Sequence, residues 1–166
     1  SKGLIRNNHD VINFSYRNYL SKNFLNKNNK LINDKVTNIA NNYRPNLIIL
    51  GHNNILDNNT LSDIKSKYSS KVILWYEDAL GYKGEGPNWR NNLSLIEKNS
   101  ELIDQYYLTT HPDEIKTNID KKKLNYLPIP VDPNIENLKI YDFKNIFKDL
   151  FFALSHGVNF GKLKRG

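Results

Sequence analysis

The protein has 166 residues, of which 39% are hydrophobic and 25% charged, and its formal net charge is +7 at pH 7. This length and balance fit one folded domain, or one domain with part of another, and exclude a disordered tail. The absence of cysteine excludes disulfides, thiolate metal sites and cysteine nucleophiles. The apolar runs are far shorter than the roughly 20 residues that cross a bilayer. The positive charge favours anionic partners, whether nucleic acid, phosphates or acidic lipid headgroups.

Apolar periodicity and helix-stop residues divide the chain into alternating helices and strands. In the first half, the prediction is a helix end at residues 3–8, a strand at 10–14, a helix over 31–40, a strand at 46–50 and a helix at 60–68, which a capping box at Thr60 to Asp63 opens. In the second half, it is a strand at 71–76, a loop at 81–87, a helix at 89–98, a strand at 104–108, a helix beginning at Pro112 and a strand at 123–129. This alternation predicts an α/β fold, a Rossmann-like sandwich with a mostly parallel sheet.

A proline-rich segment, residues 127–133, marks a domain boundary because proline neither continues a helix nor fits a central strand. We therefore expect one domain over residues 1–133. Residues 134–166 would then hold a linker, a short helix at 141–148 and a buried strand at 150–154 that begins a second domain. The lack of methionine and of a first strand suggests a chain taken from a longer protein.

The residues just after each strand are the first candidates for a site, since ligands of such sheets collect at the carboxyl ends of the strands. Glu77 and Asp78 place two carboxylates there, and Asp78 in particular could act as a general base or bind a sugar hydroxyl. The alternative is a helix N-cap and a surface acid. His52 and His111 also follow strands, and each is either a base or a histidine bonded only to backbone.

Two further segments carry candidate binding residues. A glycine-rich loop leads to Trp89 and Arg90, which could cover a carbohydrate or an anionic headgroup, although Trp89 packing onto the core is an equal alternative. The C-terminal run combines glycines with cations, a combination that can hold a diphosphate; its alternative is a solvated basic tail. Its candidate phosphate ligands are Gly157, Asn159, Gly161, Lys162 and Lys164. Four histidines without paired spacing predict no metal site.

Two segments of the chain resemble motifs of one enzyme family. Residues 4–17, with Leu4-Ile5-Arg6-Asn7-Asn8-His9 and Phe14-Ser15-Tyr16-Arg17, resemble the beginning "GLIRNGHxVxxFSxRD" of bacterial glycosyltransferases of the GT-B type. Residues 155–164, Ser-His-Gly-Val-Asn-Phe-Gly-Lys-Leu-Lys, are similar to their "SHGVNRGxLK" segment, with Phe160 where the family has Arg. Asn8 replaces the usual turn glycine, which asparagine can do because it tolerates positive φ.

The resemblance implies two Rossmann-like domains across a cleft, with the acceptor on the first and a nucleotide-sugar on the second. By matching position, the residues on the acceptor side would be Ser15, Tyr16, Arg17, His52, Asp78 and His111. Together with the candidates above, this gives Asp78, His52 and His111 as catalytic residues and Ser15, Tyr16, Arg17, Glu77, Trp89 and Arg90 as ligands of a glycan or lipid-linked acceptor. The C-terminal residues would bind the donor diphosphate without a metal or other cofactor. The 166 residues would then be the acceptor side of a glycosyltransferase, inactive without the donor domain. A cytoplasmic location is expected, with peripheral contact at the anionic inner membrane face as an option.

The alternative function is a basic α/β module that binds nucleic acid. Its support is the net charge, the Lys121-Lys122-Lys123 run and ten tyrosines available for stacking on bases. The basic residues are nevertheless spread along the chain and form no recognition motif, so nucleic acid is the less favoured partner.

Overall fold

The computed structural model describes residues 2–16, 18–19, 29–51, 56–81 and 88–130, together with the strand positions 158–159 and 162–163. The chain divides into two units, Ser1–Pro130 and Val131–Gly166. The division falls at Pro130, within the proline-rich segment and just before the expected end at Pro133. The first unit carries the parallel sheet and the helices described below.

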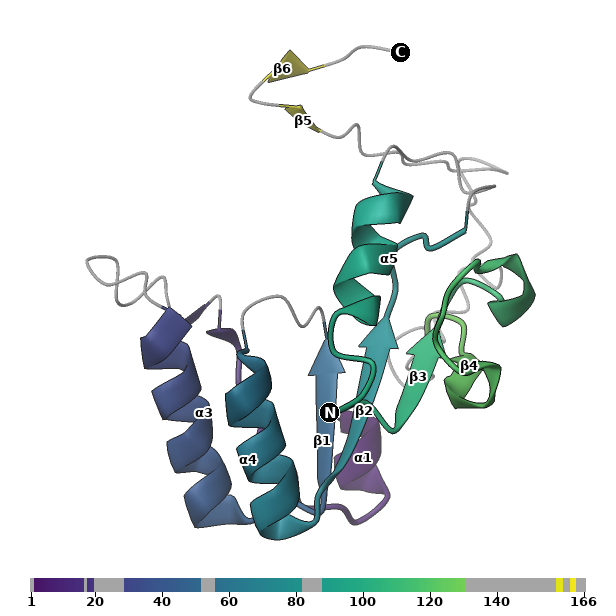
Figure 1. The fold of residues 1–166 in the computed structure, drawn as a ribbon. Coiled ribbons are helices and arrows are strands. Elements are labelled where there is room, and N and C mark those ends of the chain that lie inside the picture. Colours follow the sequence, from purple (N-terminus) through teal and green to yellow (C-terminus); the bar gives the residue numbers. More distant parts are fainter. Residues whose placement is uncertain are drawn as a thin grey trace, which may run out of the picture. The chain divides into compact units, whose positions relative to one another are not determined.

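Four parallel strands form the sheet in the order β1-β2-β3-β4. Figure 1 shows them side by side and pointing the same way. Their bounds are β1 (Leu47–Gly51), β2 (Lys71–Tyr76), β3 (Gln105–Leu108) and β4 (Leu124–Tyr126). Leu74 pairs with Tyr106, and Leu108 pairs with Tyr126. The predicted α/β class with a parallel sheet, Rossmann-like and doubly wound, is therefore confirmed.

Helices alternate with these strands along the chain. The described helices are α1 (Lys2–Arg6), α3 (Asn29–Tyr43), α4 (Asn58–Tyr68), α5 (Trp89–Glu97) and the short 3-10 turns η1 (Pro112–Glu114) and η2 (Lys121–Lys123). In Figure 1, α4 and α5 lie in front of the sheet and α3 lies beside α4. The spacing of Leu61 and Ile64, and of Leu93 and Ile96, places a pair of apolar residues on one face of α4 and of α5.

The core lies between those helices and one face of the sheet. Burial alternates along β2, where Val72, Leu74 and Tyr76 are buried and the residues between them are not. They form one cluster with the apolar face of α4 and α5 and with Tyr106, whose hydroxyl donates a 3.1 Å hydrogen bond to the carbonyl of Ile96. Because all four strands are parallel, the loops that follow them lie at one edge of the sheet.

Two predicted elements in the first half are wrong. Residues 10–14 are not a strand: a strand needs a neighbouring backbone, and here the Tyr43 hydroxyl donates to the carbonyl of Asp10 instead. The capping box at Thr60 is also absent, because α4 begins at Asn58 and its N-cap is Asp57. The buried Asn33 side chain accepts from the Asp57 backbone N–H at 2.9 Å and donates to the Asp57 carboxylate at 3.0 Å.

Two predictions in the second half need correction in length. The helix expected at Pro112 is the three-residue η1, which ends at Glu114. The strand expected over residues 123–129 is limited to Leu124–Tyr126. The Leu127 N–H still donates to the carbonyl of Leu108 at 2.8 Å, but Pro128 has no N–H to continue the pairing.

The end of α1 confirms the role predicted for Asn8. Asn8 has φ of 61°, and the flanking hydrogen bonds run from its N–H to Ile5 and from the His9 N–H to Leu4. These two bonds and a left-handed residue between them make a Schellman motif, which glycine usually completes. Asparagine therefore takes the place of the turn glycine.

The second unit is described only at two short strands, β5 (Val158–Asn159) and β6 (Lys162–Leu163). They pair antiparallel, Val158 with Leu163 and Asn159 with Lys162. The predicted helix at 141–148 and strand at 150–154 lie outside the described residues.

Candidate functional site

A polar cavity of about 300 Å³ lies where β2, β3 and β4 end. Loops that follow three neighbouring strands supply its walls, as expected for a ligand site of a parallel sheet. Its lining residues are Ala79, Gly81, Thr109, Thr110, His111, Glu114 and Tyr126.

Hydrogen bonds fix the loop after β2 against the end of β3. The Thr109 N–H donates to the carbonyl of Tyr76 at 3.2 Å, and its hydroxyl donates to the carbonyl of Glu77 at 2.8 Å. The Leu80 N–H donates to the Thr110 hydroxyl at 3.1 Å. These bonds use two side chains that line the cavity, so its walls are held in place by the sheet.

Glu77 and Asp78 directly precede Ala79, a lining residue of this cavity, in the chain. Both are exposed. The pKa of the buried Tyr76 hydroxyl is raised by its burial first, and then by the negative charges of Asp78 and Glu77. The Asp78 and Glu77 carboxylates therefore act on the Tyr76 hydroxyl and disfavour its ionised form.

His111 forms one wall of the cavity and also caps η1. Its Nδ1 accepts from the Asp113 N–H at 3.4 Å and lies 3.6 Å from the Asp113 carboxylate. With Nδ1 as an acceptor, the neutral ring carries its hydrogen on Nε2, and the doubly protonated ring carries one there as well. This geometry favours Nε2 as a hydrogen-bond donor over the role of base predicted for His111.

Glu114 and Tyr126 line the cavity, but the sequence analysis did not single them out. The ring of Tyr126 lies 5.5 Å from the His111 ring, tilted by 50°. Glu114 is the last residue of η1, and its backbone N–H donates a 2.9 Å hydrogen bond to the His111 carbonyl. Tyr126 is the last residue of β4, next to β3, so the rule of inspecting strand ends would have found it had the strand been bounded correctly.

Gly81 is buried and lies close to two other lining residues of the cavity. A β-carbon built at this position would lie 3.3 Å from the Glu114 carbonyl oxygen and 3.4 Å from Thr110 Cγ2. The loop after β2 can approach η1 this closely only because residue 81 has no side chain.

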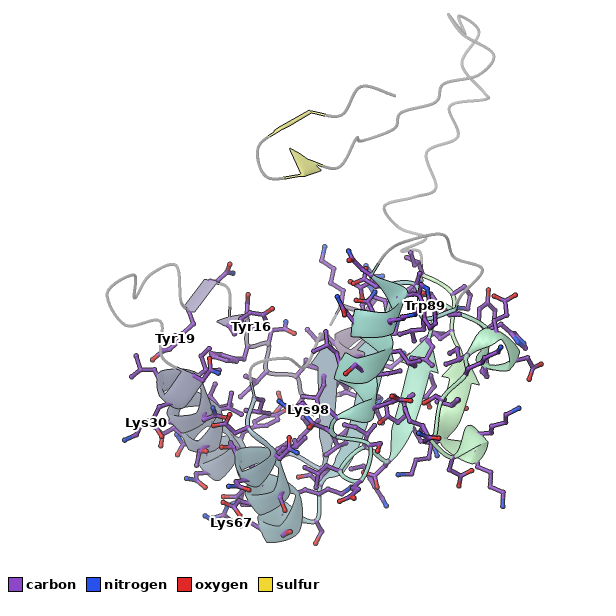
Figure 2. The ribbon with its side chains drawn as sticks, turned by 45° about the horizontal axis from the view of Figure 1, so that its top comes forward. Tyr16, Tyr19, Lys30, Lys67, Trp89 and Lys98 are labelled. Carbon is purple, nitrogen blue, oxygen red and sulfur yellow. The ribbon has the colours of Figure 1, made fainter. Side chains whose placement is uncertain are left out.

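Other predicted acceptor-side residues lie elsewhere in the first unit. Trp89 packs against the core cluster at the start of α5, and the Arg90 guanidinium carbon lies 5.2 Å from its ring centroid. Ser15 accepts from the Asn18 N–H at 3.4 Å. Figure 2 shows Tyr16 and Trp89 well apart, with Tyr16 on the side of α3 and Trp89 at the start of α5.

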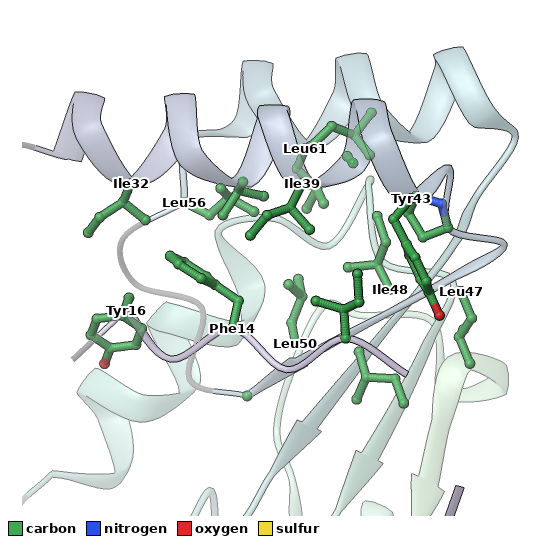
Figure 3. Close-up of a pocket in the computed structure, with 17 residues that line it drawn as sticks. Phe14, Tyr16, Ile32, Ile39, Tyr43, Leu47, Ile48, Leu50, Leu56 and Leu61 are labelled. Atoms are coloured by element: carbon green, nitrogen blue, oxygen red, sulfur yellow. The ribbon is translucent and has the colours of Figure 1, made fainter. Parts of the chain in front are cut away.

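Tyr16 lines a second cavity, of about 250 Å³, which lies between α3, β1 and residues 12–16. Figure 3 shows Phe14 and Tyr16 beneath Ile32 and Ile39 of α3. The lining is almost entirely apolar and shares no residue with the polar cavity. It lacks acids, bases and histidines, so the polar cavity is the better candidate for chemistry.

The remaining predicted site residues fall into two groups. The residues outside the described part of the chain are His52, Arg17, Gly157, Gly161 and Lys164. Two others are described only as backbone. Asn159 and Lys162 are paired residues of the β5–β6 ladder.

Several basic residues have structural roles. Lys123 Nζ donates to the carbonyls of Ser100 at 3.0 Å and Ile103 at 2.9 Å, and Lys65 Nζ donates to Leu102 at 2.7 Å. In Figure 2, Lys30, Lys67 and Lys98 lie on separate parts of the surface. The Lys121 to Lys123 run thus offers one fewer free cation to nucleic acid than the sequence suggests.

Within the described residues, no three histidine or acidic side chains are grouped as metal ligands, and none of the helices is long and apolar enough to span a membrane. Comparisons of the chain with protein-family models, with curated proteins and with solved structures find no match. The Rossmann-like α/β fold is established by the order and pairing of the four parallel strands.

Proposed function

We propose that this chain is the acceptor-side part of a glycosyltransferase that moves a sugar from a nucleotide-sugar to a hydroxyl of a glycan or lipid-linked acceptor. The observation that carries the proposal is the polar cavity at the ends of β2 to β4, which His111 lines and whose lining residue Ala79 directly follows Asp78 in the chain. The GT-B resemblance of residues 4–17 and 155–164 points to the same chemistry.

In the proposed reaction, Asp78 accepts the proton of the acceptor hydroxyl as the acceptor oxygen bonds to the anomeric carbon of the donor sugar. The bond from that carbon to the diphosphate breaks, and the nucleoside diphosphate leaves with the electron pair. His111 Nε2 donates a hydrogen bond that orients the acceptor. The basic C-terminal segment, with Lys162 and Lys164, would neutralise the leaving diphosphate.

Transfer activity tests the role of Asp78. In a form of the protein extended past Gly166 along its reading frame, Asp78→Asn should lower the rate of nucleoside diphosphate release with an acceptor present by at least about 100-fold. Asp34→Asn, at an exposed position of α3, is the matched control and should leave the rate unchanged. Equal rates for the two variants contradict the assignment.

Donor binding tests whether the second domain holds the nucleotide-sugar. Nucleotide-sugars titrated into the extended form should release heat, whereas the 166-residue chain should give little, because the proposal places most donor contacts on the second domain. Equal heat from both forms counts against the proposal. Oligonucleotide binding that weakens steeply with salt would instead favour the nucleic-acid function.

A further inference from the structure

The polar cavity has an aromatic wall made by two adjacent rings. Tyr126 and His111 are each about half exposed, at 52% and 54%, and their ring centroids lie 5.5 Å apart. Tilted rings at this distance are in contact along one edge, which leaves a face of Tyr126 open to solvent. An open aromatic face at the end of a strand offers a flat apolar surface beside polar groups.

The rest of the lining is polar and acidic. Glu114 and the hydroxyl-bearing Thr109 and Thr110 line the cavity, and Glu77 and Asp78 precede its lining residue Ala79 in the chain. No lysine or arginine occurs among the described residues that line the cavity. Carboxylates accept hydrogen bonds from hydroxyls but repel a second anion at close range, so this lining selects against phosphate and carboxylate ligands.

The volume limits what the cavity can hold. About 300 Å³ is at the lower end of small-molecule sites, which is enough to hold one sugar ring. Gly81 lies close to two other lining residues, since a β-carbon there would meet Glu114 and Thr110.

From these three features we infer that the cavity binds one uncharged pyranose ring of the acceptor. The apolar C–H face of the ring stacks on Tyr126, its hydroxyls donate to the Glu114 carboxylate, and His111 Nε2 donates to a ring oxygen. The inference rests on the proposed function and adds to it the class of acceptor, a neutral sugar in preference to a uronic acid or a sugar phosphate.

Binding of matched sugar rings to the 166-residue chain tests the inference. We would titrate methyl glucoside, methyl galactoside, methyl glucuronide and glucose 6-phosphate and follow backbone amide shifts by NMR. At least one uncharged glycoside should bind about tenfold more tightly than either anionic ring, with shifts centred on Thr109, His111 and Tyr126. Equal or tighter binding of the anionic rings, or shifts elsewhere, overturns the inference.

Variants separate stacking and charge from a structural role. Tyr126→Ala should weaken glycoside binding about tenfold, and Tyr126→Phe should retain it because the ring remains. Tyr68→Ala on α4 is the control for loss of a tyrosine outside the cavity. Glu114→Gln should improve glucuronide binding relative to glucoside, a reversal that a merely structural residue would not produce. Unchanged selectivity in Glu114→Gln contradicts the inference.

The two proposals can fail separately. If the extended form transfers sugar but prefers acidic acceptors, the neutral-ring inference fails and the glycosyltransferase proposal stands. If no ring binds and no acceptor accelerates nucleoside diphosphate release, both fail.

Discussion

The Thr109 hydroxyl donates a 2.8 Å hydrogen bond to the backbone carbonyl of Glu77, joining the ends of two neighbouring strands. Through this bond β3 positions the loop that carries Asp78. A residue of the cavity wall therefore also holds the proposed catalytic carboxylate in place.

Thr109→Val should remove this bond while keeping the shape of the side chain. The carbonyl of Glu77 loses a donor, so the free energy of unfolding should fall by about 1 kcal/mol, measured by urea denaturation. Thr109→Ser keeps the hydroxyl and should remain near the wild type. If valine and serine give the same stability, the bond does not hold the loop.

Asp104 predicts a pH-dependent contribution to stability. Partial burial acts to raise its pKa, but the hydrogen bond from the Val72 N–H, the bond and salt bridge from Lys65 and the charge of Lys71 outweigh it and lower the net pKa. The charged form is therefore favoured by folding. Its stabilisation is complete above the unfolded pKa of about 4 and is lost as the pH falls through the lower folded pKa.

Asp104→Asn should accordingly be less stable than the wild type at pH 7 by up to about 1 kcal/mol. The difference should shrink as the pH falls below about 4, when followed by urea denaturation at a series of pH values. Asp34→Asn on α3 should show no such trend. A difference that stays constant from pH 7 to pH 3 contradicts the assigned cause.

Ser69→Gly should stabilise the protein. Ser69 ends α4 with φ of 52°, a left-handed conformation that costs an L-residue about 1 kcal/mol and glycine less. After subtracting the chain entropy that glycine loses on folding, the gain should be roughly 0.5 kcal/mol in thermal or urea denaturation.

The control for this change is Ser66→Gly, at an exposed position inside α4. There glycine should lower stability by roughly 0.5 kcal/mol because it is the poorer helix former. If both glycine variants shift stability in the same direction, the left-handed end of α4 does not explain the effect.

Gly81→Ala should narrow the polar cavity. The new β-carbon would lie within 3.4 Å of Glu114 and Thr110, so we expect a loss of about 1 kcal/mol in stability and weaker glycoside binding by NMR titration. Gly51→Ala is the matched control, since a β-carbon there meets nothing within 4 Å. Normal glycoside binding by Gly81→Ala, with Gly51→Ala as reference, would show that the ring lies elsewhere.

The strand-end rule found part of the candidate site from the sequence. It indicated Glu77, Asp78 and His111, because their strands are short apolar runs that end clearly. It missed Tyr126, because proline ends β4 earlier than the apolar pattern suggests, and it missed Glu114, whose acidic side chain looked like a helix start. The tautomer of His111 was beyond the sequence, since the Asp113 backbone N–H selects it.

The sequence by itself determined the α/β class and the bounds of β2, because apolar periodicity acts over a few neighbouring residues. The left-handed Asn8 was expected from the resemblance, in which Asn8 takes the place of a turn glycine. Only the tertiary structure decided that residues 10–14 form no strand, that Asn33 binds the N-cap of α4 and that Lys123 binds two backbone carbonyls. Each of these depends on a hydrogen-bond partner at least 20 residues away in the chain. Such a partner can form its hydrogen bond to a backbone or side-chain group only after folding brings the two together. The local sequence therefore does not predict which partner it will be.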